Sequence, residues 1–207
     1  MTTYANMQAR IADELNRDDL TSQIQLAIKS AIANLETMPF YWNEQRSYID
    51  TAATQRIYEL PDNFQGVNTI TLTYNNYITL LEPRAWSYIE DITSTTESQG
   101  QPRSFAIYDY QLFVYPIPDQ VYRLTMSYYK RLEDVSATGS DNAWMDPRHG
   151  EEVVRTLAKV DLLQNVIKGN GAYTEAEVLM RRASAILANL KGENVQRTTT
   201  GRKRPTM

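Results

Sequence analysis

The stretch VNTITLTYNNYITLL, residues 67–81, decides the architecture of the middle of the chain. From Thr69 to Tyr74, threonine alternates with isoleucine, leucine and tyrosine, and this period of two is typical of a strand with one buried face. Asn75 and Asn76 interrupt the pattern, and asparagine reaches the positive φ that the tightest hairpin turns require. A second apolar run then begins at Tyr77. We therefore predict a β-hairpin with strands at 67–74 and 77–81.

Tyrosine marks how far the β-rich region extends around this hairpin. The chain has 14 tyrosines and 4 phenylalanines, and 12 of the tyrosines fall between Tyr41 and Tyr129. Tyrosine favours half-buried strands because its ring packs on the sheet while its hydroxyl stays in water. A short helix starting at Pro83 is predicted to run through Trp86 and Ile89. The further predicted strands are 41–51, 55–60, 104–108, 111–115 and 121–131, with a tight turn at Asp109-Tyr110.

Both flanks of the β-rich region are predicted to be helical. They are rich in Ala, Leu, Gln, Glu and Arg, and apolar residues recur in them at helical spacing. Thr2 or Thr3 can cap the first helix, and the second is predicted to begin near Thr21. Asp146 followed by Pro147 is a strong start for the third helix, and Gly192 is typical of the end of the fourth. The four apolar stripes are Met7, Ile11 and Leu15; Ile24, Ile28, Ala31 and Leu35; Val153, Leu157, Val160 and Ile167; and Ala176, Met180, Ala183, Leu187 and Leu190.

Neither flank can bury its stripes alone, so the four helices are expected to pack as one bundle with the β region as an insertion. The predicted fold class is α+β: a four-helix bundle, an inserted antiparallel β-rich domain and an extended C-terminal arm. We expect the bundle to span residues 1–39 and 146–192, the β domain 40–131, a linker 132–145, and the arm 193–207.

The arm is set apart by its charge. Residues 195–207 contain four basic side chains and no acid, so they carry +4, whereas residues 1–194 carry −8 within a total of −4. A segment without apolar periodicity cannot build a core of its own. We therefore expect it to be extended and held by a partner.

Composition argues against an enzyme. The 207 residues include no cysteine and one histidine, which excludes disulfides, thiolate catalysis and Cys- or His-rich metal sites. His149 is interpreted as a surface histidine near a helix start, and the paired carboxylates fall at helix starts or turns. No apolar stretch is long enough to cross a bilayer, and the first residues lack a secretory signal. We expect no catalytic residue, no metal and no cofactor.

A series of short motifs follows one another in a recognisable order. Each motif alone is common in other proteins, but the order and spacing together are specific. The motifs are YANMQARIADEL at 4–15, FYWNE at 40–44, YELPDNF at 58–64, AIY at 106–108, LFVYPIPD at 112–119, SYYKRL at 127–132, NAW at 142–144 and TGRKRPT at 200–206.

In this order the motifs resemble the head-to-tail adaptor (connector) family of tailed bacteriophages. The resemblance implies a non-enzymatic virion protein at the head–tail junction, present in the host cytoplasm during assembly. It implies a ring, usually of twelve copies, that joins the portal to the tail tube or nozzle. Double-stranded DNA would pass through the lumen without sequence-specific binding, and an acidic body suits such a lumen because it does not neutralise phosphates. No membrane partner is expected.

The resemblance also implies where the partners bind. The arm is expected to insert into the portal, and tips of the β region are expected to face the tail. The arm residues are Arg197, Thr198, Thr199, Thr200, Gly201, Arg202, Lys203, Arg204 and Pro205. The tail-facing residues are Tyr74, Asn75, Asn76, Tyr108, Asp109 and Tyr110.

Contacts between ring neighbours are expected from the bundle, because helices beside an insertion present long continuous faces. These contacts should be largely polar with a few apolar anchors. The charged residues assigned to the exposed faces are Arg10, Asp13, Glu14, Arg155, Lys159, Arg181 and Arg182.

Three alternatives remain open. The first is a neck or head-completion protein of a long-tailed phage, which only the particle or neighbouring genes would separate from an adaptor. The second is a carbohydrate-binding module or glycosidase that uses Trp42 or Trp86 in the Tyr/Trp-rich region. The third is a nucleic-acid-binding protein that acts through its basic arm, with steeply salt-dependent affinity.

Overall fold

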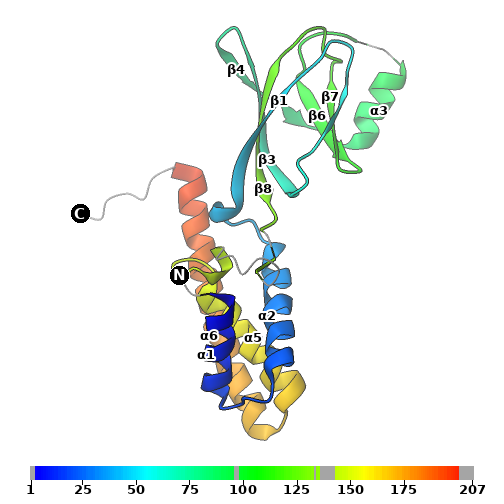
Figure 1. Cartoon of the computed structure of the whole chain (residues 1–207). Coiled ribbons are helices and arrows are strands. Elements are labelled where there is room, and N and C mark those ends of the chain that lie inside the picture. The colour runs from blue at the N-terminus through cyan, green and yellow to red at the C-terminus, as the bar shows by residue number, and fades with distance from the viewer. Residues whose placement is uncertain (1–2, 96–97, 133, 136–142, 201–207) are drawn as a thin grey trace, which may run out of the picture. The chain divides into compact units, whose positions relative to one another are not determined.

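The computed structural model describes residues 3–95, 98–132, 134–135 and 143–200. The chain has an α+β fold and divides into two compact units (Figure 1). The helical unit consists of residues 1–42 and 132–207, and the β unit consists of residues 43–131. The β unit is thus inserted between two segments that fold together.

The helical unit is built from long helices on both sides of the insertion. Helices α1 and α2 precede the β unit, and α5, the π-helical turn η3 and α6 follow it. The bounds are α1 Tyr4–Leu15, α2 Thr21–Glu36, η1 Tyr41–Asn43, η2 Ala143–Met145, α5 Glu151–Asp161, η3 Leu162–Ile167 and α6 Asn170–Thr200.

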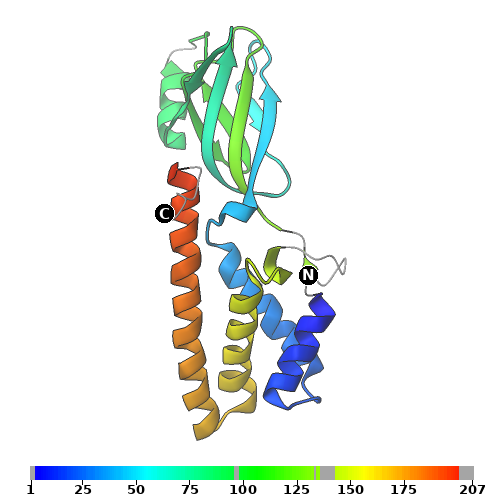
Figure 2. The same cartoon turned by 90° about the vertical axis from the view of Figure 1, so that its left-hand side faces the viewer.

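Helix α5 is the centre of the helical unit. It packs against α2 and α6, and more lightly against α1, and Figure 2 shows it between α6 and the N-terminal pair. Val153, Val154 and Ala158 are completely buried, and Arg155 and Thr156 on other sides of the helix are buried as well. Helices α2 and α6 therefore cover different sides of α5, and each has an outward face.

The N-terminal helices begin where the sequence predicts. Thr3 caps α1, because its Oγ1 accepts a hydrogen bond from the Asn6 N–H at 3.2 Å. Asn16 ends α1 in the left-handed region with φ 50°. Helix α2 starts at Thr21, as predicted, and ends just before Met38-Pro39.

The predicted start of the third helix at Asp146-Pro147 is wrong, because α5 begins at Glu151. The Asp146 carboxylate accepts hydrogen bonds from the Arg148 backbone and side chain, and so it closes a turn over 146–149 rather than a helix. Gly150 then brings the backbone against Trp144: a Cβ there would lie 2.6 Å from Trp144 Cε3. Close packing, not backbone freedom, requires this glycine.

The end of the third helix also differs from the predicted regular helix. Residues 162–167 form a π-helical turn, which widens the helix by one residue per turn and shifts its register. The shift buries Leu162 and Leu163 and turns Gln164 outward. At regular helical spacing Gln164 would fall within the predicted stripe between Val160 and Ile167, and the π-helical turn places it outside.

The predicted end of the fourth helix at Gly192, and with it an extended arm from residue 193, is wrong over 193–200. Helix α6 continues through Gly192 to Thr200. A single interior glycine costs a helix only about 1 kcal/mol. Leu190 is buried, and Asn194 Nδ2 donates a hydrogen bond to the Pro39 carbonyl at 2.8 Å, so contacts on both sides of Gly192 hold the helix. Residues 201–207 of the predicted arm lie outside the described residues.

The described residues of the β unit form two four-stranded sheets and one helix. The first sheet has the strand order β1-β8-β3-β4 and the second has β2-β7-β6-β5. All pairs are antiparallel except β5 with β6. The bounds are β1 Glu44–Asp50, β2 Ile57–Glu59, β3 Phe64–Tyr74, β4 Tyr77–Leu80, β5 Glu82–Pro83, α3 Trp86–Thr95, β6 Ser104–Tyr108, β7 Gln111–Tyr115 and β8 Arg123–Lys130.

The main core of the β unit is formed by side chains from both sheets. The second sheet also packs α3 on its other face, where Ile89 meets Ala106 and Phe113. The unit is thus layered as sheet, sheet and helix (Figure 1). The buried residues of the main core are Tyr58, Ile70, Leu72, Leu81, Phe105, Leu112, Val114, Tyr122, Leu124, Met126 and Tyr128.

Both predicted hairpin turns are confirmed. Asn75 and Asn76 have φ of 48° and 65°, and Asp109 and Tyr110 have φ of 48° and 56°. Two consecutive residues at positive φ are the signature of a two-residue type I′ turn, whose twist matches that of the paired strands.

Two local predictions in the β region are wrong. Residues 41–43 form a 3₁₀ turn rather than the start of a strand. Pro83 belongs to β5 rather than to a helix: the Glu82 N–H donates to the Arg103 carbonyl and the Arg84 N–H to the Phe105 carbonyl. The chain is held extended along β6 there, and α3 begins only at Trp86.

Candidate interaction surfaces

The tip of the first hairpin lies at one end of the β unit. Tyr74 and Tyr77 are paired across the turn, and Thr73 lies opposite Arg123, where β8 begins. The Tyr74 ring is half-buried against Tyr122, with ring centroids 5.1 Å apart. This end is remote from residues 43 and 131, at which the chain enters and leaves the unit (Figure 1).

The tip of the second hairpin lies at the opposite end of the β unit. Gln111 pairs with Glu59, which is separated by a short loop from Phe64, and Phe64 pairs with Lys130 at the end of β8. The six residues predicted to face the tail are therefore divided between two ends. Asn75 and Asn76 are at one end, and Tyr108, Asp109 and Tyr110 are at the other (Figure 1).

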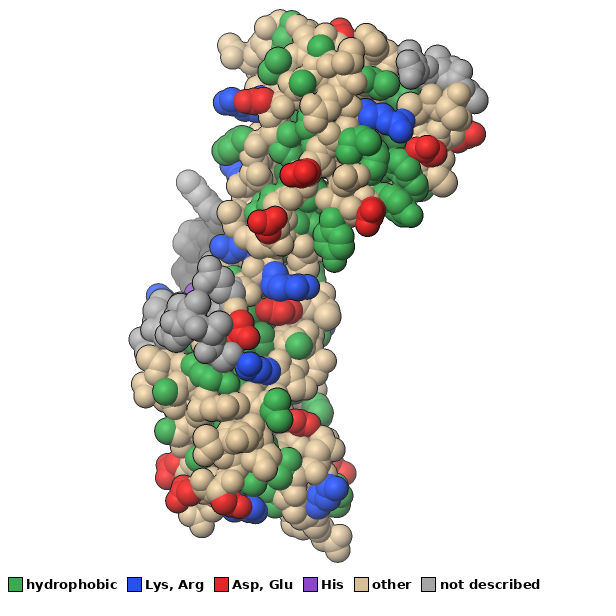
Figure 3. All heavy atoms as spheres, turned by 45° about the vertical axis from the view of Figure 1, so that its right-hand side comes forward, with side chains coloured by type: hydrophobic (Ala, Val, Ile, Leu, Met, Phe, Trp, Pro, Cys, Tyr) green, Lys and Arg blue, Asp and Glu red, His purple; other side chains and the backbone are tan. Residues whose placement is uncertain are grey.

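Hydrophobic side chains are exposed over much of the β unit. Figure 3 shows them gathered on the side next to α3. Over the whole unit, β4 is the strand with the most exposed apolar side chains: Tyr77, Ile78 and Leu80 are 79%, 72% and 60% exposed. The other exposed members of this unit are Tyr48, Ile57, Tyr88, Tyr108, Tyr110 and Val121.

The exposure of β4 is not evident from the predicted strand 77–81. A regular alternation would bury every second residue, yet Tyr77 and Thr79 are exposed although they share a face with buried Leu81. The signal was the run of Ile78, Leu80 and Leu81, in which apolar residues occupy both faces of the strand.

The outward faces of α2 and α6 also expose apolar side chains. On α2, Leu26 is exposed although Ile24 and Ile28 on either side are buried. On α6, the buried Ala176, Ala183 and Leu190 face inward, and apolar residues also lie on the outside of the helix. The exposed residues of α6 are Tyr173, Val178, Met180 and Val195.

A network of charged side chains joins α1 to α5. Glu14 accepts hydrogen bonds from Arg10, Arg155 and Lys159. Burial raises the pKa of Glu14, but the hydrogen bond from Lys159 and the charges of Lys159 and Arg155 outweigh it and lower the pKa below its usual value.

The charged residues of this network are not free for neighbours. The Arg155 side chain is only 10% exposed and also lies beside the buried Glu151. The prediction that Arg155 and Lys159 belong to an exposed charged face is therefore wrong: their side chains are only 10% and 15% exposed, and both pair with Glu14. Glu14 itself is at an exposed position, as predicted.

An aromatic cluster lies in the hydrophobic core of the helical unit. Phe40 stacks on Trp42 at 4.4 Å, and both meet Trp144 edge to face. His149 is not a surface residue, since its side chain is only 23% exposed and its ring lies 5.2 Å from the Trp42 ring.

His149 lies 3.1 Å from Asp146, the kind of pair that orients a catalytic base. Hydrogen bonds from the Arg148 side chain and backbone lower the pKa of Asp146 further than His149 does. Among the described residues, no serine or threonine hydroxyl hydrogen-bonds His149, so the nucleophile of a triad is not in place. The pair acts as a structural contact.

Both tryptophans of the carbohydrate-binding alternative are packed against other aromatic rings. Trp42 is stacked in the aromatic cluster described above. Trp86 lies against Tyr108 at 5.2 Å and nearly parallel, and against Phe113 at 4.1 Å. Stacking of a sugar on either ring would require these contacts to open.

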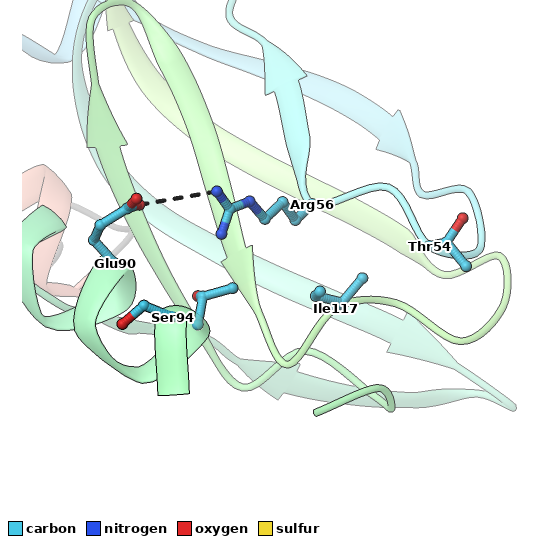
Figure 4. A pocket seen from close by; sticks show the side chains of 6 residues that line it. Thr54, Arg56, Glu90, Ser94 and Ile117 are labelled. Carbon is cyan, nitrogen blue, oxygen red and sulfur yellow. Dashed lines mark ion pairs between the residues drawn. The ribbon is translucent and has the colours of Figure 1, made fainter. Parts of the chain in front are cut away.

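The described part of the β unit has hollows on its surface, and two of them are lined by polar side chains. The smaller, of about 420 Å³, is lined by Thr54, Thr93 and Ser94, with Arg56 and Glu90 paired across it at 3.9 Å (Figure 4). The larger, of about 860 Å³, runs beside β4 and β5. Within the described ranges, no group of three or more His, Asp or Glu side chains is placed to hold a metal.

The predicted arm residues divide at the end of α6. Arg197, Thr198, Thr199 and Thr200 form its last turn, whereas Gly201 to Pro205 lie outside the described residues. Over the described part of the chain, no helix combines the length and the apolar character that crossing a membrane requires.

The family model described as SU10 adaptor protein matches residues 2–204, a span that includes both units and most of the basic tail. No curated protein matches the chain.

Proposed function

The chain belongs to the SU10 adaptor protein family, and from that premise we propose that it forms the ring that joins the portal to the tail of a bacteriophage. The observation that carries the proposal is the extent of the family match, which runs from residue 2 to residue 204 and leaves no unit outside it. The proposed role is structural and needs no catalytic residue or cofactor. The body of residues 1–194, with a charge of −8, suits a lumen through which DNA slides.

The helical unit supports a closed ring. A cyclic ring requires two different patches on each copy, placed so that one copy's first patch meets the next copy's second. The outward faces of α6 and α2 meet this requirement because the two helices pack on different sides of α5. We propose that Val178, which lies on the side of α6 opposite the buried Ala176, packs near Leu26 of the next copy. Twelve copies follow from the resemblance alone.

The ring contact is tested by charge substitution. Leu26→Arg or Val178→Arg should convert rings to single copies at micromolar concentration, as measured by native mass spectrometry. Val121→Arg is the matched control, because Val121 of the β unit is about as exposed as Leu26 and Val178. Rings that survive both helical substitutions would contradict this interface.

The basic end of the chain is proposed to anchor the ring on the portal. Arg197 lies in the last turn of α6, and Arg202, Lys203 and Arg204 follow it in sequence. At about 3.3 Å per residue, the seven residues 201–207 reach at most about 23 Å. Such an anchor is shorter than the full 13-residue arm would be, so we propose that the end of α6 itself approaches the portal.

The tail side is proposed to be the end of the β unit that carries Asn75 and Asn76. That end is remote from the chain connections at residues 43 and 131. The Tyr108–Tyr110 tip lies at the other end and is not proposed to share this contact.

The decisive experiment uses DNA-filled heads that lack this protein. Adding the purified chain should retain the DNA and permit tail attachment, and mass spectrometry should find the chain in mature particles. Deleting residues 201–207 should prevent retention, whereas Thr206→Ala should not. A chain absent from mature particles, or heads that mature fully without it, would overturn the adaptor role.

A further inference from the structure

We propose that the open edge of β4, together with the groove beside it, binds an extended peptide segment of a partner protein that carries an acidic side chain. The segment would join the first sheet as an additional strand, with its acid directed to Arg103. This inference goes beyond the adaptor role and rests on the β unit alone.

The backbone of β4 is paired on one side only. The two-residue turn makes Tyr74 and Tyr77 a hydrogen-bonded pair, and the Leu81 N–H donates to the Ile70 carbonyl at 2.9 Å. Hydrogen-bonded pairs alternate along antiparallel strands, so the N–H and C=O groups of Ile78 and Leu80 point away from β3. Among the described residues, neither has another backbone partner.

The same backbone edge is already used farther along the chain. Two residues after Leu80, the outward Glu82 N–H donates to the Arg103 carbonyl at 2.9 Å. There β6 lies beside β5 as a parallel strand. A bound peptide would therefore occupy, along Ile78 and Leu80, the position that β6 occupies along β5.

The opposite edge of the first sheet is defended and β4 is not. Strand β1 carries Glu44, Arg46 and Asp50, and Asp50 forms a two-pronged pair with Arg123 at 2.8 and 2.9 Å. Charged side chains on an edge strand discourage pairing with another chain. Strand β4 has no charge and exposes Ile78 and Leu80, so its open edge favours strand addition.

The groove beside β4 adds side-chain recognition. It has a volume of about 860 Å³ and is lined by Leu80, Tyr88 and Tyr115 among apolar groups, and by Glu82, Arg84 and Arg103 among charged ones. Strand addition obtains affinity from main-chain hydrogen bonds and specificity from pockets for alternate side chains. The groove provides such a pocket at the end of the open edge.

The charges of the groove select an acid. Glu82 neutralises Arg84, since their ion-pair distance is 2.6 Å, and the Arg84 guanidinium lies 5.5 Å above the Tyr88 ring. Arg103 is exposed and has no ion pair among the described residues. The lining therefore holds one excess positive charge, which complements a peptide with a single aspartate or glutamate.

A partner peptide fits this site better than a second copy of the chain does. Pairing of β4 with β4 would join only four residues from each copy. The area that these residues bury is far less than the roughly 1,200 Å² that a stable interface buries. It would also leave the groove empty. A peptide that follows both the edge and the groove uses the whole surface.

The test uses the full-length chain and two fluorescent ten-residue peptides of alternating threonine and valine that differ at one position, glutamate against lysine. Fluorescence anisotropy should show the glutamate peptide binding at least about fivefold more tightly. Arg103→Glu should reverse this preference. Ile78→Pro removes the outward N–H and should weaken binding about tenfold, while the β3 ladder, which does not use that N–H, remains.

Two controls keep the proposal open to refutation. The first control is Tyr48→Pro, which alters the β1 edge at a position 64% exposed and should leave peptide affinity unchanged. The second is circular dichroism, which must show that each variant is folded. If Ile78→Pro unfolds, Ile78→Lys replaces it. Equal peptide affinity of the wild type and the Ile78 variant would overturn the proposal. So would a concentration-dependent dimer, seen by sedimentation, that Ile78→Lys abolishes.

Discussion

In the helical unit, ionised side chains lie within the packing: Arg155 and Glu151 are buried where α1 meets α5, and each is paired. In the β unit, apolar side chains lie outside it, most of all on β4. Charge inside a unit makes its packing specific but leaves it vulnerable to the loss of one partner. Apolar surface outside a unit adds little to stability and is available for binding. The two units therefore should respond differently to the same kinds of substitution.

The largest effect is expected from Gly150→Ala. A Cβ at this position would meet Trp144 at 2.6 Å from Cε3 and 3.0 Å from Cα, so the helix or the tryptophan must shift. We expect a loss of about 2–3 kcal/mol in the free energy of unfolding, measured by denaturant titration of tryptophan fluorescence. Gly192→Ala is the control: no atom lies within 4 Å of its Cβ, and in a helix alanine should stabilise by about 0.5–1 kcal/mol. Equal destabilisation by both variants would refute the role of Trp144.

Arg155→Met should come next. Removing the guanidinium leaves the buried Glu151 and half-buried Glu14 with fewer partners, and we expect a loss of about 2 kcal/mol. Arg123→Met in the β unit removes an exposed pair with Asp50 and should leave the unfolding temperature nearly unchanged, because water screens the pair. The measurement is the unfolding temperature of both variants. An equal decrease for the two variants would contradict the difference between the units.

Acid should weaken the helical unit through Glu14. Its pKa is lowered in the folded state from an ordinary value of 4.5, so its stabilising contribution is complete above that value and is lost as pH falls through the folded pKa. Glu14→Gln should flatten the dependence of unfolding free energy on pH between about pH 5 and pH 3. The comparison is of denaturation midpoints across that range; an unchanged slope would count against it.

The smallest effect on stability is expected at β4. Ile78→Thr replaces an exposed aliphatic side chain with another β-branched one, so the unfolding free energy should change by less than about 0.5 kcal/mol. Light scattering on heating should nevertheless decrease, because the variant presents a less apolar edge. A stability loss above 1 kcal/mol would mean that Ile78 is packed.

Local chemistry explains what could be predicted from sequence. The turns at Asn75-Asn76 and Asp109-Tyr110 depend on residues within a few positions of one another, and both were predicted correctly. The same holds for the cap of α1, for which Thr2 and Thr3 were the candidates and Thr3 is the cap. The start of α5 and the path of α6 depend on distant residues: Trp144 sets the position of Gly150, and Pro39 accepts a hydrogen bond from Asn194. Such contacts leave no periodic signal.

The candidate surfaces were predicted less well than the fold for the same reason. A period of two shows which residues alternate, but not whether a second sheet covers them, so the exposure of β4 was missed. Charges were read as exposed because charge is normally exposed. Arg155 and Lys159 break that rule because they meet Glu14 across two helices.

The pairing of Glu44 with Tyr129 has a consequence for how this chain can vary. Opposed residues of antiparallel strands have Cα atoms about 5 Å apart, so the two ends of the inserted segment lie side by side. An inserted segment whose ends are adjacent can be replaced by another segment, or by a short turn, without a change in the path of the flanking helices. The β unit can therefore diversify in evolution by replacement of the whole segment, while the helical unit stays unchanged.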